Sequence, residues 1–202
     1  MIIDLSVPIN EQTPVYPGDR STKIEQAGVL DRDGYTDHYV SIGTHIGTHI
    51  DAPMHMLPNA KGLDKVPIEQ LIGRGRYISV EDSFDLNKVK TASIQPGDIV
   101  LFHTGMSDKY HDQVYFEDYP VMSEKIAKYL IGQGVKVVGV DTCSVDNQES
   151  FPIHKILLEG NVLIIENLTN LNDLASKEFK VYALPIKLQI DGAPARVIAE
   201  VK

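Results

Sequence analysis

The sequence lacks the features that mark several large classes of protein. Cys143 is its only cysteine, so no disulfide can form within the chain and a reducing compartment fits. No apolar stretch approaches the length of a membrane span. The opening residues also lack the basic and then apolar segments of a signal peptide. We therefore expect a cytoplasmic protein without a membrane partner.

Runs of basic residues are absent too. Lys and Arg number 19 against 28 Asp and Glu, which gives a formal net charge of −9. Because phosphate binding needs a basic face, we expect no nucleic-acid partner. The 202 residues, 43% of them hydrophobic, are enough to bury a core without disulfides or structural metals. We predict one domain that spans residues 1–202.

Histidine, by contrast, is concentrated in one place. Three of the seven histidines lie in residues 45–55, His-Ile-Gly-Thr-His-Ile-Asp-Ala-Pro-Met-His. In an extended chain these histidines and Asp51 would all point to one face, whereas a helix would turn Asp51 away from His45 and His49. A straight strand would hold the Cα atoms of His45 and His49 roughly 13 Å apart at ~3.3 Å per residue. We therefore expect a bend near Gly47.

Imidazole and carboxylate groups in this pattern indicate a metal site. A catalytic zinc site usually takes three protein ligands and leaves a position for water, and His45, His49 and Asp51 make one such set. His55 would remain close by as an acid and base near pH 7. The alternative is a polar network of histidines on a sheet face, which would need partners for both nitrogens of each ring.

Strands outnumber helices in the predicted order of elements. We predict strands over 2–7, 76–80, 99–102, 135–140, 161–167, 181–190 and 196–201, and extended chain over 39–41 that leads into the histidine run. Helices are predicted from Ser123, as the N-cap, to about Gly132 and over 154–159. The unit from 99 to 140 has the pattern of a strand–helix–strand crossover. The expected fold class is α/β with a mixed β-sheet.

Acidic residues at the ends of apolar strands are further candidates. Glu166 ends one such strand, where a carboxylate is costly unless it is paired or bound to metal, although a solvated strand end would also explain it. Asp141 and Asp146 are either residues that orient ligands or structural acids. We expect Cys143 to be a small packed residue, because no activating group is evident.

The histidine run resembles the signature of the cyclase family, whose best-known members are bacterial kynurenine formamidases and isatin hydrolases. Further segments are similar to motifs of that family, in the same order along nearly the whole chain: 14–19, 100–105, 139–146, 154–158 and 165–168. The resemblance implies a swivelling β/β/α domain with a barrel-like core and few helices. It also implies a homodimer or homotetramer.

The resemblance implies roles for single residues as well. His45, His49 and Asp51 would hold one divalent metal ion, and Asp51 would bridge to a second ion bound by His154 and Glu166. His55 would donate and accept the proton. One or two ions are expected, with zinc suited to these ligands and manganese also possible.

Two positions differ from the kynurenine formamidases. Tyr16 stands where those enzymes carry a tryptophan that packs on the substrate, and this chain has no tryptophan. We expect Tyr16 to bind the substrate by stacking in its place. His103 stands where an arginine is common, and histidine is less suited to clamp a carboxylate at two points.

The sequence thus predicts a metal-dependent hydrolase that acts on C–N bonds other than peptide bonds. Its substrate would be a small amide or cyclic amide, as for an arylformamidase, with metal-activated water as the nucleophile. One alternative is hydrolysis of isatin, lactones or esters at the same site. The other is a metal-binding or ligand-binding protein without catalytic activity.

Overall fold

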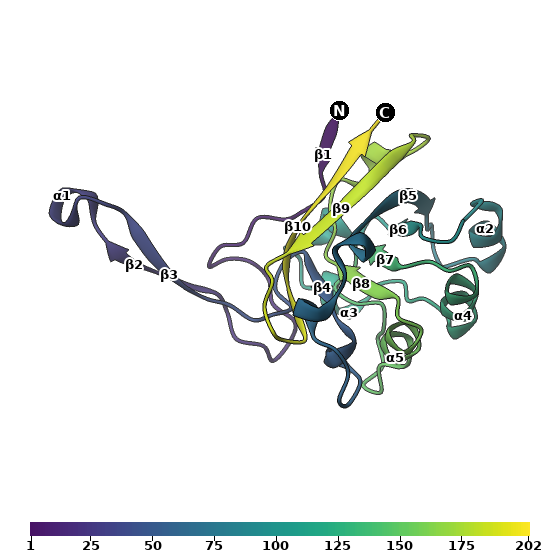
Figure 1. Cartoon of the computed structure of the whole chain (residues 1–202), viewed down its shortest axis with the longest axis horizontal. Helices are drawn as coiled ribbons and strands as arrows, with labels where there is room; N and C mark the ends of the chain where they lie inside the picture. Colours follow the sequence, from purple (N-terminus) through teal and green to yellow (C-terminus); the bar gives the residue numbers. More distant parts are fainter.

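A closed sheet forms the centre of the protein in the computed structural model, which describes residues 1–202 (Figure 1). The strands are β1 (Ile2–Asp4), β2 (Lys23–Gly28), β3 (Asp37–Ser41), β4 (His49–Asp51), β5 (Ile72–Ser79), β6 (Ile99–His103), β7 (Val137–Val140), β8 (Leu163–Glu166), β9 (Phe179–Pro185) and β10 (Gly192–Val201). The helices are α1 (Leu30–Asp33), α2 (Leu86–Thr91), α3 (Val114–Glu117), α4 (Glu124–Gly132) and α5 (Pro152–Glu159). Short 3-10 helices are η1 (Pro53–His55), η2 (Leu63–Lys65), η3 (Ile68–Gln70), η4 (Met106–Lys109) and η5 (Leu171–Leu174).

The long strand β10 closes the sheet into a barrel. Its residues 192–194 pair with β4, and its residues 195–201 pair with β9. The remaining order around the barrel is β4-β8-β7-β6-β5-β9, and β1 adds to β10. Strands β5 to β8 run parallel while the other pairs are antiparallel, so the predicted mixed sheet is confirmed.

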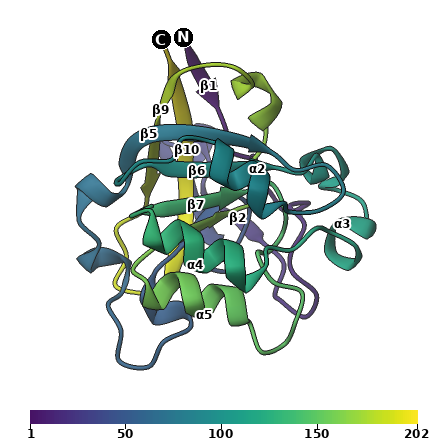
Figure 2. The same ribbon diagram turned by 90° about the vertical axis from the view of Figure 1, so that its right-hand side faces the viewer.

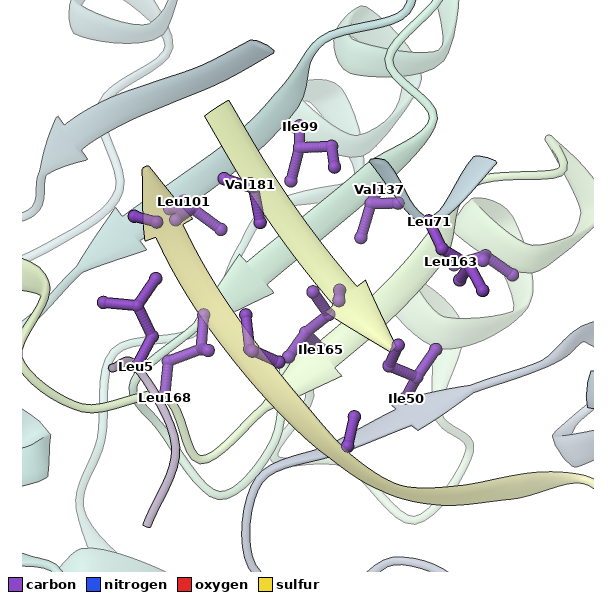
Figure 3. Packing of buried hydrophobic residues seen from close by; sticks show 14 of the residues in the cluster. Leu5, Ile50, Leu71, Ile99, Leu101, Val137, Leu163, Ile165, Leu168 and Val181 are labelled. Carbon is purple, nitrogen blue, oxygen red and sulfur yellow. The ribbon is translucent and has the colours of Figure 1, made fainter. Parts of the chain in front are cut away.

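Apolar side chains fill the barrel (Figure 3). A cluster of 22 buried residues lies there, and strands β4 and β6 to β10 and the N-terminal segment contribute to it. On β7, Val137 belongs to this inner cluster, while Val138 belongs to a second cluster of 19 residues. This division follows from the alternation of side chains along a strand.

The second cluster lies between the parallel strands and the helices that cover them. Figure 2 shows α4 and α5 side by side in front of the parallel strands, and α5 packs against β8. Ile126, Ala127 and Leu130 form the buried stripe of α4, at the spacing of one helix face. Ser123 is the N-cap residue, as predicted, although its side chain makes no capping hydrogen bond. None of the helices is long and apolar enough to cross a membrane.

A hairpin arm extends from the barrel at the opposite side from these helices (Figure 1). It consists of β2, α1 and β3, and every residue of β3 is exposed. Only residues 39–41 of this arm were expected to be extended chain. The strand predicted over 181–190 was also wrong in extent, because the chain leaves the sheet after Pro185 and re-enters it at Gly192.

Candidate metal centre

The histidine run forms a tight turn followed by the short strand β4. Gly47 has φ +57°, in the left-handed region that glycine adopts readily, so the predicted bend is present. The turn brings the rings of His45 and His49 to 5.0 Å between centroids. The period-two pattern holds only over residues 49–51, since His45 precedes the turn and His55 lies in η1.

Pairing of β4 with β8 brings an acid opposite a histidine. His49 and Glu166 are directly opposed in the antiparallel register. The Nε2 atom of His49 lies 3.4 Å from Glu166 Oε2 and 3.4 Å from Asp51 Oδ1. These three side chains come from adjacent strands, so the barrel itself sets the distances between them.

His154 reaches the same point from helix α5. Asp146 accepts hydrogen bonds from the backbone N–H groups of Ile153 and His154, at 3.0 and 2.9 Å, and so holds the first turn of that helix. It also contacts His154 Nδ1 at 2.8 Å. The other ring nitrogen, Nε2, then lies 3.2 Å from Glu166 Oε1 and 3.5 Å from Asp51 Oδ2.

Three histidines share one pattern of contacts. Each directs one ring nitrogen at the buried carboxylates: Nδ1 of His45, Nε2 of His49 and Nε2 of His154. Each places its other nitrogen 2.8 Å from an outer oxygen: Asp191 Oδ2, the Gly47 carbonyl and Asp146 Oδ2, respectively. Each outer oxygen accepts a hydrogen bond from the ring N–H beside it, so the inner nitrogen is the one that could offer a lone pair to a metal ion.

Two atoms at the middle of this cluster are buried without a hydrogen-bond partner. They are His49 Nε2 and Asp51 Oδ2. A buried polar group left in this way costs about 1–3 kcal/mol. A divalent cation would satisfy both atoms, and imidazoles with carboxylates are a donor set that zinc and manganese accept. The residues present therefore fit a metal ion.

The charges of the cluster shift the pKa values of its members. Burial lowers the pKa of His45, but Asp51 and Asp191 outweigh burial and raise it to about 9. Burial would raise the pKa of Asp51, but the neighbouring histidines hold it well below its ordinary value. Burial likewise opposes the shift at Glu166, whose pKa is lowered by His154 and His49. Both acids are therefore carboxylates at neutral pH, as ligands must be.

His55 differs from the other three histidines. Its ring lies 3.9 Å from that of His45 and 5.8 Å from that of His154, between centroids. Burial is the main reason that its pKa is lowered, so the ring is neutral near pH 7. A neutral imidazole beside the cluster can accept a proton and return it.

The cluster opens into a cavity of about 280 Å³. His45, His49, His55, His154 and Glu166 line it together with apolar side chains that include Tyr16, Met56, Phe116 and Phe151. The Tyr16 ring stands edge-on to that of Phe116, at 6.3 Å between centroids. The structure thus brings all seven predicted site residues to this cavity or to the cluster beneath it, with Asp51 fully buried below the surface.

The acids left open in the sequence analysis have separate positions. Asp146 orients His154, as described above. Asp141 accepts hydrogen bonds from Thr104 and Gly105 and contacts no ligand histidine of the cluster. His103 contacts Tyr77 at 2.9 Å and does not line the cavity. The Cys143 thiol does line it, but burial raises its pKa to about 12 and keeps it protonated.

Asp191 is the residue that sequence reasoning missed. It directly precedes β10, and its Oδ2 atom contacts His45 Nε2 at 2.8 Å. The dipeptide Asp191-Gly192 looks like a simple turn in the sequence. Only the pairing of Gly192 with Asp51 reveals that it lies beside the histidines.

The fold and this cluster define a class: a closed, mixed α/β barrel with a cluster of histidines and carboxylates where β4 pairs with β8. Residues 3–147 match the family described as "Putative cyclase". An uncharacterized protein of Methanocaldococcus jannaschii is 36% identical over 189 residues, which cover 91% of each chain. The chain belongs to the cyclase family, as its motifs predicted.

Named relatives and solved structures agree with this assignment. A kynurenine formamidase of Bacillus cytotoxicus is 29% identical over 97% of this chain and 95% of its own. A potential metal-dependent hydrolase with cyclase activity superposes with a TM-score of 0.84 at 30% identity, over 98% of this chain and 96% of that one. An isatin hydrolase bound to the product analogue thioisatinate shares the fold, with a TM-score of 0.88 at 22% identity over 100% and 92% of the two chains.

Proposed function

We propose that this protein is a metal-dependent hydrolase that cleaves the C–N bond of a small amide or cyclic amide. The observation that carries the proposal is the pair of buried atoms without partners, His49 Nε2 and Asp51 Oδ2, at the floor of the cavity. Kynurenine formamidase and isatin hydrolase, the names of two similar proteins, are enzymes of this reaction class.

The ligands divide into two sets around Asp51. His45, His49 and Asp51 would hold one ion, with Asp51 Oδ1 lying 2.8 Å from His45 Nδ1. His154 and Glu166 would hold a second ion that shares Asp51, whose Oδ2 atom faces His154. We favour zinc, with manganese also compatible, and one or two ions.

A divalent cation at this centre would acidify a bound water and polarise the substrate carbonyl. His55 then supplies the proton transfers. It accepts a proton from the attacking water as the C–O bond forms, and it returns that proton to the leaving nitrogen as the C–N bond breaks. The lowered pKa of His55 suits the first of these steps, because the ring is neutral before reaction.

The cavity favours a flat, partly apolar substrate. Tyr16, Phe116 and Phe151 line it with aromatic rings, which can stack on a planar group. Its volume of about 280 Å³ suits a small molecule and not a folded polymer. We assign Tyr16 to substrate binding.

The exposed arm supports assembly into a homodimer or homotetramer. Tyr35, Tyr39 and Val40 on the arm are 59%, 72% and 55% exposed, although their side chains are large and apolar. A second copy of the chain would cover such a surface. Light scattering coupled to size-exclusion chromatography measures the state directly, and a monomeric mass would refute the assembly.

Metal content and substrate turnover test the proposed function together. Protein purified without chelator is analysed by mass spectrometry for zinc and manganese, with one or two ions per chain expected. The loaded protein is then assayed on an N-formyl aniline, on isatin and on a lactone. Turnover of the first two supports amide hydrolysis; turnover of the lactone alone, or of none, contradicts it. Treatment with a chelator must abolish the activity, and added metal must restore it.

A further inference from the structure

Asp191 lies beside the histidine cluster but outside the sequence motifs that contain the candidate metal ligands. It lies at the start of β10, where its backbone carbonyl accepts a hydrogen bond from the Ala52 N–H group at 2.8 Å. Its neighbour Gly192 pairs with Asp51. A side chain on Gly192 would lie 2.8 Å from His45 Cε1 and 2.8 Å from the Ile50 carbonyl oxygen. Glycine thus lets the His45 ring lie against β10, directly beside the Asp191 carboxylate.

One oxygen of Asp191 faces two histidines. Its Oδ2 atom is 2.8 Å from His45 Nε2 and 3.5 Å from His55 Nδ1. The two rings are tilted by only 33° and lie 3.9 Å apart between centroids. The longer contact would become a hydrogen bond after a small rotation of the His55 ring, and hydrogen bonds of catalytic groups often tighten in this way when substrate binds.

The shorter contact indicates which nitrogen of His45 would keep its proton when an ion is bound. A carboxylate only accepts, so His45 Nε2 donates to Asp191, and Nδ1 is the nitrogen that would give up its proton and offer a lone pair to an ion. That Nδ1 atom is the one directed at Asp51. Asp146 has the same relation to His154 on the opposite side of the cluster, through its 2.8 Å contact with Nδ1.

We propose that Asp191 is a positioning residue that serves both a metal ligand and the acid–base histidine. It holds the proton of His45 on the outer nitrogen, and it orients His55 toward the cavity by attracting the N–H group at Nδ1. The proposal rests on the hydrolase function proposed above and assigns one carboxylate to two separate parts of the reaction.

Asp191 differs from the candidate ligands in two ways. Its side chain is 34% exposed, and its Oδ2 atom already has a close partner in His45. Asp51 Oδ2, by contrast, is buried without a partner. Asp191 also does not line the cavity, so it contacts no bound substrate. Its effect on the reaction must therefore pass through His45 and His55.

Asp191→Asn keeps the shape of the side chain but replaces one acceptor oxygen with a donor amide. We expect the variant to bind the same number of zinc ions as the unaltered protein, with an affinity lower by about 10–100-fold, as for loss of other residues that orient metal ligands. The value of kcat should fall by a similar factor while KM stays within about 3-fold, because no substrate contact is lost. Asp191→Glu should restore part of the zinc affinity and part of kcat. Asp173→Asn, which changes an exposed acid in η5, is the matched control.

Three measurements decide the matter. Competition with a chromophoric chelator gives zinc stoichiometry and affinity, steady-state kinetics give kcat and KM, and ¹⁵N NMR of the histidine rings gives the tautomer of His45. In the zinc-loaded, unaltered protein the expected tautomer carries its proton on Nε2. Loss of one bound ion in Asp191→Asn would make Asp191 a ligand and overturn the proposal, as would kinetics and affinity equal to those of the control. If the unaltered protein bound no metal and hydrolysed nothing, the hydrolase function would fail. The ¹⁵N NMR spectrum would still show whether His45 Nε2 carries the proton that it donates to Asp191.

Discussion

Two buried aspartates of this protein have opposite relations to their neighbours. Asp98 is 2% exposed and Asp51 is 0% exposed, and both are surrounded by basic side chains. Asp98 directly precedes β6, whereas Asp51 ends β4 and pairs with Ile164 of β8, three strands away in the sheet. Their burial and charge are alike, so the difference between them must come from their contacts.

Both carboxylate oxygens of Asp98 already accept hydrogen bonds. Arg74 donates to both of its oxygens at 2.7 and 2.9 Å, Arg76 donates at 3.3 Å, and the Gln95 backbone N–H group donates at 2.8 Å. Arginine stays protonated and has no lone pair to offer a metal ion. Around Asp51 the basic groups are imidazoles, and its Oδ2 atom has no partner. A buried acid thus indicates a metal site only where its oxygens lack hydrogen-bond donors and where imidazole nitrogens that can offer lone pairs lie close to it.

Asp51→Ala should have the largest effect of any single change. It removes the only carboxylate shared by the two proposed ligand sets, so we expect loss of bound metal and a fall in kcat/KM beyond the ~10²–10⁴-fold typical of losing an acid–base group. Mass spectrometry of the purified variant measures the metal, and circular dichroism checks the fold. Full metal content in a folded variant would remove Asp51 from the ligand set.

His55→Ala should separate catalysis from metal binding. The expected result is unchanged metal content with activity reduced by about 10²–10⁴-fold, because proton transfer is lost while the ligands remain. His111→Ala, which removes an exposed histidine away from the cavity, is the matched control and should retain full activity. If His55→Ala also lost metal, its assignment as the acid–base residue would be wrong.

The part of this centre that sequence reasoning predicted is local. The geometry of residues 45–55 follows from their own sequence, because Gly47 permits the turn and side chains then alternate between the two faces of β4. Glu166 was noticed as an acid at the end of an apolar strand, and its opposition to His49 supports that reasoning. The roles of His154 and Glu166 came from the family resemblance, since nothing in their spacing from residue 49 reveals the contact.

The parts that could not be predicted depend on contacts between distant segments. Asp191 meets His45 only because β10 pairs with β4 at its start and with β9 further along, which closes the barrel. No local pattern encodes that closure. Most of the arm escaped prediction for a different reason: β3 is exposed on both faces, so it shows no alternation of apolar and polar residues.

Gly192→Ala tests how closely the barrel closure holds the histidines. The added Cβ atom would lie 2.8 Å from a backbone oxygen and from the His45 ring, so something must shift. We expect a loss of about 1–3 kcal/mol in the free energy of unfolding, as for overpacking, together with weaker zinc binding. Gly132→Ala, where a Cβ would meet nothing within 4 Å, is the control. Urea denaturation and chelator competition measure the two effects, and wild-type zinc affinity would show that His45 can move freely.

Asp98→Asn should have the smallest effect, and only on stability. The Arg74 and Arg76 side chains are 48% and 29% exposed, so water can replace much of what the carboxylate provides. The amide keeps one acceptor oxygen, and we expect a loss of about 1 kcal/mol in the free energy of unfolding. Metal content and kcat should equal those of the unaltered protein, because no ligand is touched. A variant that unfolds at lower urea concentration yet binds zinc fully would confirm the contrast with Asp51. Loss of zinc would mean that a full set of hydrogen bonds does not distinguish a structural acid from a metal ligand.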